Sequence, residues 1–429
     1  MAADIFAGAQ ASATLGASQS AQPEVSKWFF LRYALAYIGT FTALITPVVM
    51  TLAVRIEAID PVNKGANLGI VLGLGALAAL IANPLFGMLS DRTTSRFGRR
   101  RPWMVGGVLL GLISLLIIAQ SSSIAVIALF WCITQGALNA ALSALIAVVA
   151  DQVPEHQRAR VSAIAGMSTN IGMLVGTAIV AMVGTGGTAM FLWPTLFGVA
   201  MVLLFCLINE DKAVQPSAAR EKISAAAVLK SFWVNPVKFP DYGWAWLSRF
   251  LVFYGTSTLL AYQVYVLIDM FAVAPEAIPG MMLLSTIITA VSVVIFASIA
   301  GWYSDRTGKR KIFVFIAAVV FAIGLTVLVS TGTLTGFFIG IAIQAAGFGV
   351  YLSIDQALVV DVLPNRETEA AKNLGVMNIA NAVPQTLAPA IAPIILMVGG
   401  QGNYTLLFIV AAIVTFGGAL AILPVKGAK

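Results

Sequence analysis

Apolar runs of about 20 residues, separated by short polar segments, fill the chain from residue 28 onward. An α-helix needs a run of that length to cross about 30 Å of hydrocarbon at 1.5 Å per residue. Helices are required, because an open strand would leave backbone groups unpaired in lipid. The pattern predicts twelve transmembrane helices over residues 28–54, 66–90, 103–120, 124–150, 160–183, 189–209, 243–269, 277–304, 311–330, 333–361, 370–398 and 402–424.

The composition agrees with an all-α membrane protein. Of the 429 residues, 59% are hydrophobic and 10% are charged, whereas a soluble chain carries about 25% charged residues. The net charge of +7 does not indicate a nucleic-acid partner, because basic residues of membrane proteins gather on the cytoplasmic side. With a cytoplasmic N-terminus, every lysine and arginine faces inward except Arg55 and Lys64. This distribution predicts a multi-pass protein of the plasma membrane, the inner membrane in bacteria, with both termini cytoplasmic.

Polar segments divide the chain into two halves. Residues 1–26 are rich in Ala, Ser, Gln and Gly without periodicity and predict a disordered cytoplasmic tail. Residues 210–242 are the longest polar connection and predict a cytoplasmic linker between six-helix bundles at 27–209 and 243–425. Within the linker, residues 218–232 fit either an amphipathic helix at the membrane interface or an ordinary exposed helix.

The two halves repeat each other. The loop that begins at Gly87 reads GMLSDRT, and it returns as GWYSDRT from Gly301, about half a chain later. The segment DQVP from Asp151, after the fourth helix, corresponds to DVLP from Asp361, after the tenth. Matches at a nearly constant offset indicate two pseudo-symmetric bundles. Parallel six-helix halves place a substrate site between them, near the middle of the membrane.

At these two loops the sequence resembles the major facilitator superfamily, whose loop after the second and eighth helices reads G-x-x-x-D-R-x-G-R/K-R/K. The second copy matches with Gly301, Asp305, Arg306, Gly308, Lys309 and Arg310. The first copy is longer and reads S-D-R-x-x-S-R-x-G-R-R-R-P. That form is similar to sucrose–proton symporters and to glycoside–pentoside–hexuronide cation symporters. The resemblance implies a major facilitator fold and a secondary active transporter that works by alternating access.

The resemblance also implies that the loop residues latch the two halves in the outward-open state. Carboxylates at a helix end can pair with arginine or accept hydrogen bonds from a helix N-terminus, and glycine permits close helix approach. The alternative for Arg99–Arg101 is that they only fix topology. The predicted latch comprises Gly87, Asp91, Arg92, Gly98, Arg99, Arg100, Asp151, Gly301, Asp305, Arg306, Gly308 and Asp361.

Asp355 is an exception among the acids, nearly all of which lie in the tail, in loops or at helix ends. It shares one helix face with Gln344, Phe348 and Tyr351. Because an ionisable group in lipid is costly, we expect Asp355 to line a central cavity and to accept the coupling proton or bind substrate hydroxyls. The alternative is structural, with Asp355 bonded to a neighbouring helix and never titrating.

Polar side chains on other helices complete the predicted substrate site. Aromatic rings can stack on sugar faces and amides can bond hydroxyls, although helix-to-helix contact is the alternative role for each residue. Arg32 and Arg249 lie near helix ends, so no basic residue is expected at mid-membrane, which favours a neutral or weakly charged solute. The candidates beside Asp355 are Tyr33, Tyr37, Gln135, Asn139, Asn170, Tyr254, Thr258, Tyr262, Gln344, Tyr351, Asn378, Asn381 and Gln385.

These features predict symport of a small solute, a sugar or glycoside in the first place, with H⁺ or Na⁺. A drug–proton antiporter is one alternative, although the Gly-Pro usual in its fifth helix is absent here, and an uncoupled facilitator is another. An enzyme is disfavoured because His156, the one histidine, lies in a polar loop and no phosphate-binding loop is present. Cys132 and Cys206 lie in apolar runs and indicate no metal site. We expect no cofactor and a monomer in the lipid bilayer.

Overall fold

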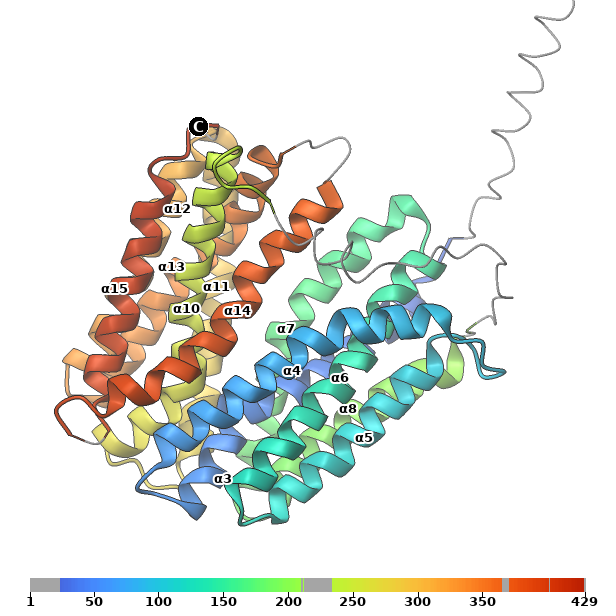
Figure 1. The fold of residues 1–429 in the computed structure, drawn as a ribbon, viewed down its shortest axis with the longest axis horizontal. Coiled ribbons are helices and arrows are strands. Elements are labelled where there is room, and N and C mark those ends of the chain that lie inside the picture. The colour runs from blue at the N-terminus through green and yellow to red at the C-terminus, as the bar shows by residue number, and fades with distance from the viewer. Residues whose placement is uncertain (1–23, 210, 212–233, 365–369, 401, 428–429) are drawn as a thin grey trace, which may run out of the picture.

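The computed structural model describes residues 24–427 except 210, 212–233, 365–369 and 401 (Figure 1). Twelve of its helices are long and apolar enough to span a membrane, which confirms the predicted number. The predicted tail over most of 1–26 and the possible helix at 218–232 lie outside the described residues. The elements are α2 (Lys27–Thr46), η1 (Pro47–Thr51), α3 (Leu52–Ile59), α4 (Lys64–Arg92), α5 (Arg101–Gln120), α6 (Ile124–Gln152), α7 (Glu155–Val183), α8 (Ala189–Ile208), α10 (Pro240–Tyr265), η2 (Val266–Met270), α11 (Ile278–Thr307), α12 (Arg310–Ser330), α13 (Leu334–Asp361), α14 (Ala370–Leu396) and α15 (Tyr404–Ile422).

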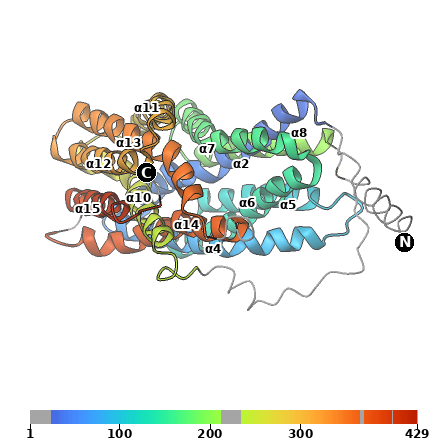
Figure 2. The ribbon, with the colours of Figure 1, turned by 90° about the horizontal axis from the view of Figure 1, so that it is seen from above.

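The helices form two bundles, α2–α8 and α10–α15, which Figure 2 shows side by side. Packing inside the second bundle repeats packing inside the first. The contacts of α6 with α4 and α5 recur as those of α13 with α11 and α12, and the contact between α2 and α8 recurs between α10 and α15. The predicted pair of pseudo-symmetric six-helix bundles is therefore confirmed.

The first helix of each bundle contains a π-helical turn near one end, η1 in the first bundle and η2 in the second. In η1, Pro47 has no N–H, so the carbonyl of Ala43 loses its intrahelical donor and the helix widens locally.

The bundles diverge from one end of the molecule to the other (Figure 1). We call the end that carries the loop 93–100 and both described chain ends the terminal face, and the end with loops 60–63 and 271–277 the opposite face. Contacts between the bundles join α4 to α14, α7 to α11, and α10 to η1, α3 and α4.

Glycines on α4 locate its contact with α14. A Cβ added at Gly69 would lie 2.4 Å from the oxygen of Pro389, and one at Gly65 would lie 2.7 Å from Leu396. Farther along, a Cβ at Gly87 on α4 or at Gly375 on α14 would meet nothing within 4 Å. The bundles are thus in close contact toward the opposite face and separated toward the terminal face.

Candidate functional site

The polar residues of α14 lie on the face that turns toward the other bundle. By helical spacing, Asn378 and Gln385 lie on the same face of α14 as Pro389 and Pro393. Both prolines pack against α4 at Gly69. Asn378 and Gln385 are both exposed in this state. Asn381, also on α14, is half-buried and its backbone oxygen accepts a hydrogen bond from Gln385 Nε2.

The predicted residues of the N-terminal bundle are less accessible. Asn139 Nδ2 donates to the backbone oxygen of Gln135 at 2.8 Å and to its Oε1 at 3.3 Å, so these buried amides of α6 bond each other. Tyr33 and Tyr37 are buried in an aromatic row along α2, with ring centroids 5.7 Å apart. Asn170 on α7 is exposed.

The tyrosines of α10 close the opposite face instead of lining the separated side. Tyr262 donates to the backbone oxygens of Gly65 in α4 and Pro389 in α14, at 3.2 and 3.4 Å. Tyr265 donates to the oxygen of Ala53 in α3 at 3.0 Å. In the same helix, Tyr254 and Thr258 are buried. Tyr262, predicted to bind substrate, therefore makes an inter-bundle contact in this state.

Asp355 is ion-paired inside the C-terminal bundle. Its Oδ2 accepts Nε of Arg249 at 2.7 Å and also the Nη2 group, and the two residues are 3% and 2% exposed. Tyr351, one turn earlier on α13, and Gln344 are buried as well. The expectation that Arg249 would lie near its helix end and leave the interior without a basic group was wrong, since Arg249 lies well inside α10. The contact is the one that the structural alternative for Asp355 requires.

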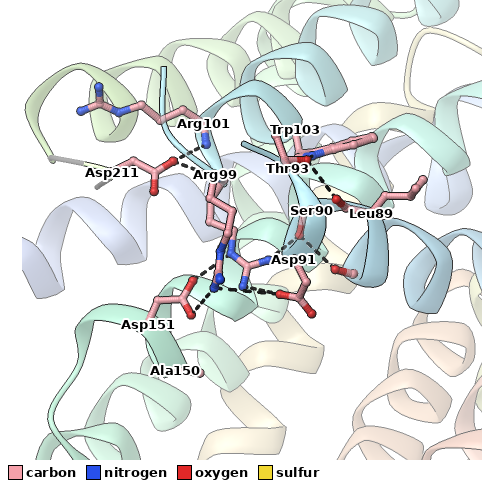
Figure 3. A network of polar contacts seen from close by, with 12 residues as sticks. Leu89, Ser90, Asp91, Thr93, Arg99, Arg101, Trp103, Ala150, Asp151 and Asp211 are labelled. Carbon is pink, nitrogen blue, oxygen red and sulfur yellow. Dashed lines mark hydrogen bonds and ion pairs between the residues drawn. The ribbon is translucent and has the colours of Figure 1, made fainter. Parts of the chain in front are cut away.

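An arginine network organises the loop after α4 (Figure 3). Arg100 binds Asp151 through Nε at 2.8 Å, Asp91 through Nη2 at 2.6 Å and the Ser90 hydroxyl through Nη1 at 2.5 Å. Arg99 adds a second contact to Asp151, at 2.6 Å. Burial alone would lower the pKa of Arg100, but hydrogen bonds and charges from Asp151 and Asp91 raise it overall, so the guanidinium stays charged.

The second bundle holds the repeat-related pair. Arg310, which corresponds to Arg100, binds Asp361, which corresponds to Asp151. Of the other predicted latch residues, Arg92 is exposed, Arg306 stacks on Trp302 at 4.0 Å, and the Asp305 side chain lies outside the described part. Gly308 ends α11 with a φ of 66°.

These ion pairs lie within single bundles in this state, and Gly87 and Gly301 make no close helix approach, since an added Cβ at either meets nothing within 4 Å. The predicted latch between the bundles therefore remains a prediction about another state of the protein.

Asp211, which sequence reasoning missed, fixes the same loop. Its Oδ2 accepts the backbone N–H groups of Arg100 and Arg101 at 2.6 and 2.9 Å and so caps α5 (Figure 3). Gly98, with a φ of 102°, lets the loop approach so closely that an added Cβ would lie 2.2 Å from Asp211. Arg101 also donates to the backbone oxygen of Asn209. The loop thus holds the start of the linker, which no local pattern indicated.

Twelve helices of membrane-spanning length, in two repeat-related bundles that pack closely toward the opposite face, have the architecture of a membrane transporter. The family profile of the Major Facilitator Superfamily matches residues 29–293 and 277–429, so the chain belongs to this family and is a multi-pass membrane transporter, not an enzyme.

Several solved structures share this fold. The nucleoside transporter NupG has a TM-score of 0.74 at 16% identity, covering 92% of this chain and 99% of its own. A D-xylose–proton symporter has a TM-score of 0.66 at 16% identity, covering 94% of this chain and all (100%) of its own. At this level of identity the likeness shows the fold alone.

Sequence relatives match over different lengths. A Haemophilus influenzae protein assigned to metabolite transport is 24% identical over 401 residues, 86% of this chain and 88% of its own length. An uncharacterized symporter of Synechocystis is 42% identical over 18% of this chain. A sucrose transport protein of Oryza sativa subsp. japonica is 35% identical over 19% of this chain. The matched region spans only 14% of each of these last two proteins.

Replacing Arg100 by glutamine should lower the free energy of unfolding by about 2 kcal/mol, because it removes a cation that binds Asp151, Asp91 and Ser90 in a partly buried site. Thermal unfolding of the purified protein measures the loss. Arg96→Gln is the matched control, since Arg96 is exposed in the same loop and lies over Phe97. Equal stability of the two variants would leave topology as the only role of Arg100.

Proposed function

We propose that this transporter imports a small neutral polyhydroxyl solute, a sugar or a glycoside, together with protons across the plasma membrane. The observation that carries the proposal is the chemistry of the diverged inter-bundle face. Among the described side chains of α14, the exposed polar ones are the amides Asn378 and Gln385, and Asn170 is exposed on α7. Amides donate and accept hydrogen bonds without charge, as sugar hydroxyls require.

The two charged side chains buried inside the C-terminal bundle neutralise each other. Arg249 and Asp355 bind each other, so neither offers an unpaired charge to an anionic solute. A phosphate ester or dicarboxylate would instead favour an unpaired arginine clamp. The sequence likeness to segments of a sucrose transport protein and the fold shared with a D-xylose–proton symporter support the same solute class.

Asp355 is the proposed proton site. Both contacts from Arg249 go to Oδ2, while the buried Oδ1 is not engaged by Arg249, and the Tyr351 hydroxyl interacts with the same carboxylate. A proton can therefore bind Oδ1 while Arg249 remains in place, and protonation would weaken the ion pair between α10 and α13. Coupling would then act by changing how these two helices pack.

The proposed orientation places the terminal face in the cytoplasm. The loop 93–100 and the turn at Gly308 and Lys309 carry basic residues at this face, whereas Arg55 and Lys64 lie toward the opposite face. The positive-inside rule supports this direction. The state described here is then open to the cytoplasm, and a monomer contains the whole site.

An uncoupled facilitator is the second candidate, and the Arg249–Asp355 ion pair favours it. A carboxylate held by arginine at 2.7 Å is stabilised in its charged form and can serve packing alone. The facilitator needs the same solute site as the symporter. The two candidates differ only in whether a proton gradient drives transport of the solute.

Asp355→Asn separates them. The amide keeps an oxygen for Arg249 but cannot carry an exchangeable carboxyl proton. Symport predicts that sugar accumulation driven by a pH gradient in vesicles is lost, whereas exchange of labelled for unlabelled sugar continues.

Glu276→Gln is the control, because Glu276 is an exposed acid in the loop 271–277 and belongs to neither the predicted latch nor the solute site. This variant should still accumulate sugar when a pH gradient is imposed. Gradient-driven accumulation by Asp355→Asn at the level of the unmodified protein would contradict coupling through Asp355 and support the facilitator.

Removing an amide from the inter-bundle face should weaken solute binding. Asn378→Ala and Gln385→Ala each remove hydrogen bonds to hydroxyls, so the Kd should rise about 3- to 10-fold. Titration of the purified protein with mono- and disaccharides and glycosides, alongside uronates as anionic competitors, gives the Kd and the solute class. Asn63→Ala, in an exposed loop of the opposite face, should leave the Kd unchanged; an equal effect there, or tighter binding of the uronates, would count against this site.

A further inference from the structure

One lysine joins the two bundles at the opposite face and binds two carboxylates. Lys64, at the start of α4, lies 2.6 Å from Oδ1 of Asp269 in η2 and 2.7 Å from Oε2 of Glu57 in α3. Its ammonium is also 5.2 Å from the ring centroid of Tyr265. Although Lys64 lies near a loop, it is only 8% exposed. Neither the proposed solute site nor the proton site uses this cluster.

The two carboxylates belong to different bundles. Glu57 and Lys64 are both in the N-terminal bundle, whereas Asp269 is in the C-terminal bundle. The hydroxyl bonds of Tyr262 and Tyr265 cross between the bundles at this same face. When the bundles part here, the Lys64–Asp269 contact must break, but the Lys64–Glu57 contact can persist.

The cost of this step depends on what Lys64 binds afterwards. A buried ammonium that loses its only carboxylate pays a large desolvation penalty. Glu57 already contacts the ammonium, so Lys64 can leave Asp269 without becoming unpaired. While the face is closed, the ammonium contacts both carboxylates at once, so Glu57 is already in place when Asp269 leaves.

We propose that Glu57 is an exchange partner that releases Lys64 from Asp269 when the opposite face opens. Asp269 holds the face closed, and Glu57 makes that closure reversible. The two acids touch the same nitrogen but have opposite effects on the conformational equilibrium. This inference rests on alternating access alone and on no particular solute or coupling ion.

The test compares two variants that should shift the population open at the opposite face in opposite directions. Asp269→Asn removes the ionic bond between the bundles and should raise the population open at the opposite face by roughly fivefold, the change given by an ion pair of about 1 kcal/mol. Glu57→Gln removes the carboxylate that keeps Lys64 paired after it leaves Asp269. This variant should therefore lower the open population by a similar factor. Both variants remove one negative charge from one cluster, so a general charge effect would shift them in the same direction.

The readout is the rate at which a thiol reagent modifies Gly73→Cys in a background without Cys132 and Cys206. A Cβ at Gly73 lies 3.6 Å from the oxygen of Thr386, an ordinary van der Waals distance, and Gly73 is buried, so a thiol at this position becomes reactive when the contact opens. This rate scales with the open population even where that population is small. Electron–electron distances between spin labels at Ser122→Cys and Gly280→Cys, on separate bundles at this face, measure the same change directly.

Asp60→Asn is the matched control. Asp60 lies at the same face, but its partners Asn63 and Asn67 belong to its own bundle. Hydrogen bonds from the backbone and side chain of Asn63 lower the pKa of Asp60, so the control also removes a real charge. It should leave the modification rate unchanged.

Faster modification of Asp269→Asn together with slower modification of Glu57→Gln supports the exchange. The proposal is overturned if both variants shift in the same direction, if Glu57→Gln does not slow modification, or if Asp60→Asn shifts as far as Asp269→Asn. Sugar uptake driven by a pH gradient is measured separately. A negative result for the exchange therefore leaves the proposed function standing, and a negative result for uptake leaves the exchange standing.

Discussion

Backbone contact between α4 and α14 holds the two bundles together at the opposite face. Pro393 has no N–H, so the carbonyl of Pro389 loses its intrahelical donor. That carbonyl turns toward Gly69, where any side chain would collide with it, and accepts the Tyr262 hydroxyl at 3.4 Å. The Pro389 carbonyl is therefore partly satisfied by Tyr262 of its own bundle. The same carbonyl packs against Gly69 of the other bundle.

The same two helices explain how the contact can change sides. Gly87 on α4 and Gly375 on α14 continue the faces that carry the closed contact, and both are open in this state. Neither glycine has a side chain that would prevent the helices from meeting there. If the bundles rock, the close approach moves from Gly69 toward these glycines, while ion pairs such as Arg100–Asp151 and Arg310–Asp361 keep the loop ends of each bundle rigid.

Much of the fold could be predicted from the sequence, because hydrophobic length and a long-period repeat depend on local composition. The apolar runs predicted all twelve helices. One repeated segment marked Asp151 and Asp361, and the other repeated loop contains their arginine partners, Arg100 and Arg310. The partner of Asp355 could not be found in this way. Arg249 is 106 residues distant, and its depth depends on where α10 begins.

The site was harder to predict for a second reason. A polar stripe on a helix does not say whether its face is closed or open in the packed structure. Tyr262 fits a sugar-binding pattern but bonds backbone carbonyls across the closed contact, and Lys64 reaches Asp269 over 205 residues. Asn378 and Gln385 are exposed in this state, and their role in solute binding stays a prediction.

The most direct measurement is a cross-link between Gly87→Cys and Gly375→Cys in membranes, with the native cysteines replaced. The account predicts that a short bifunctional thiol reagent joins the two helices in a fraction of the molecules, that solute raises or lowers this fraction, and that the cross-link blocks uptake until it is reduced. Failure to form the cross-link under any condition, or full uptake by the cross-linked protein, would contradict alternating contact between α4 and α14.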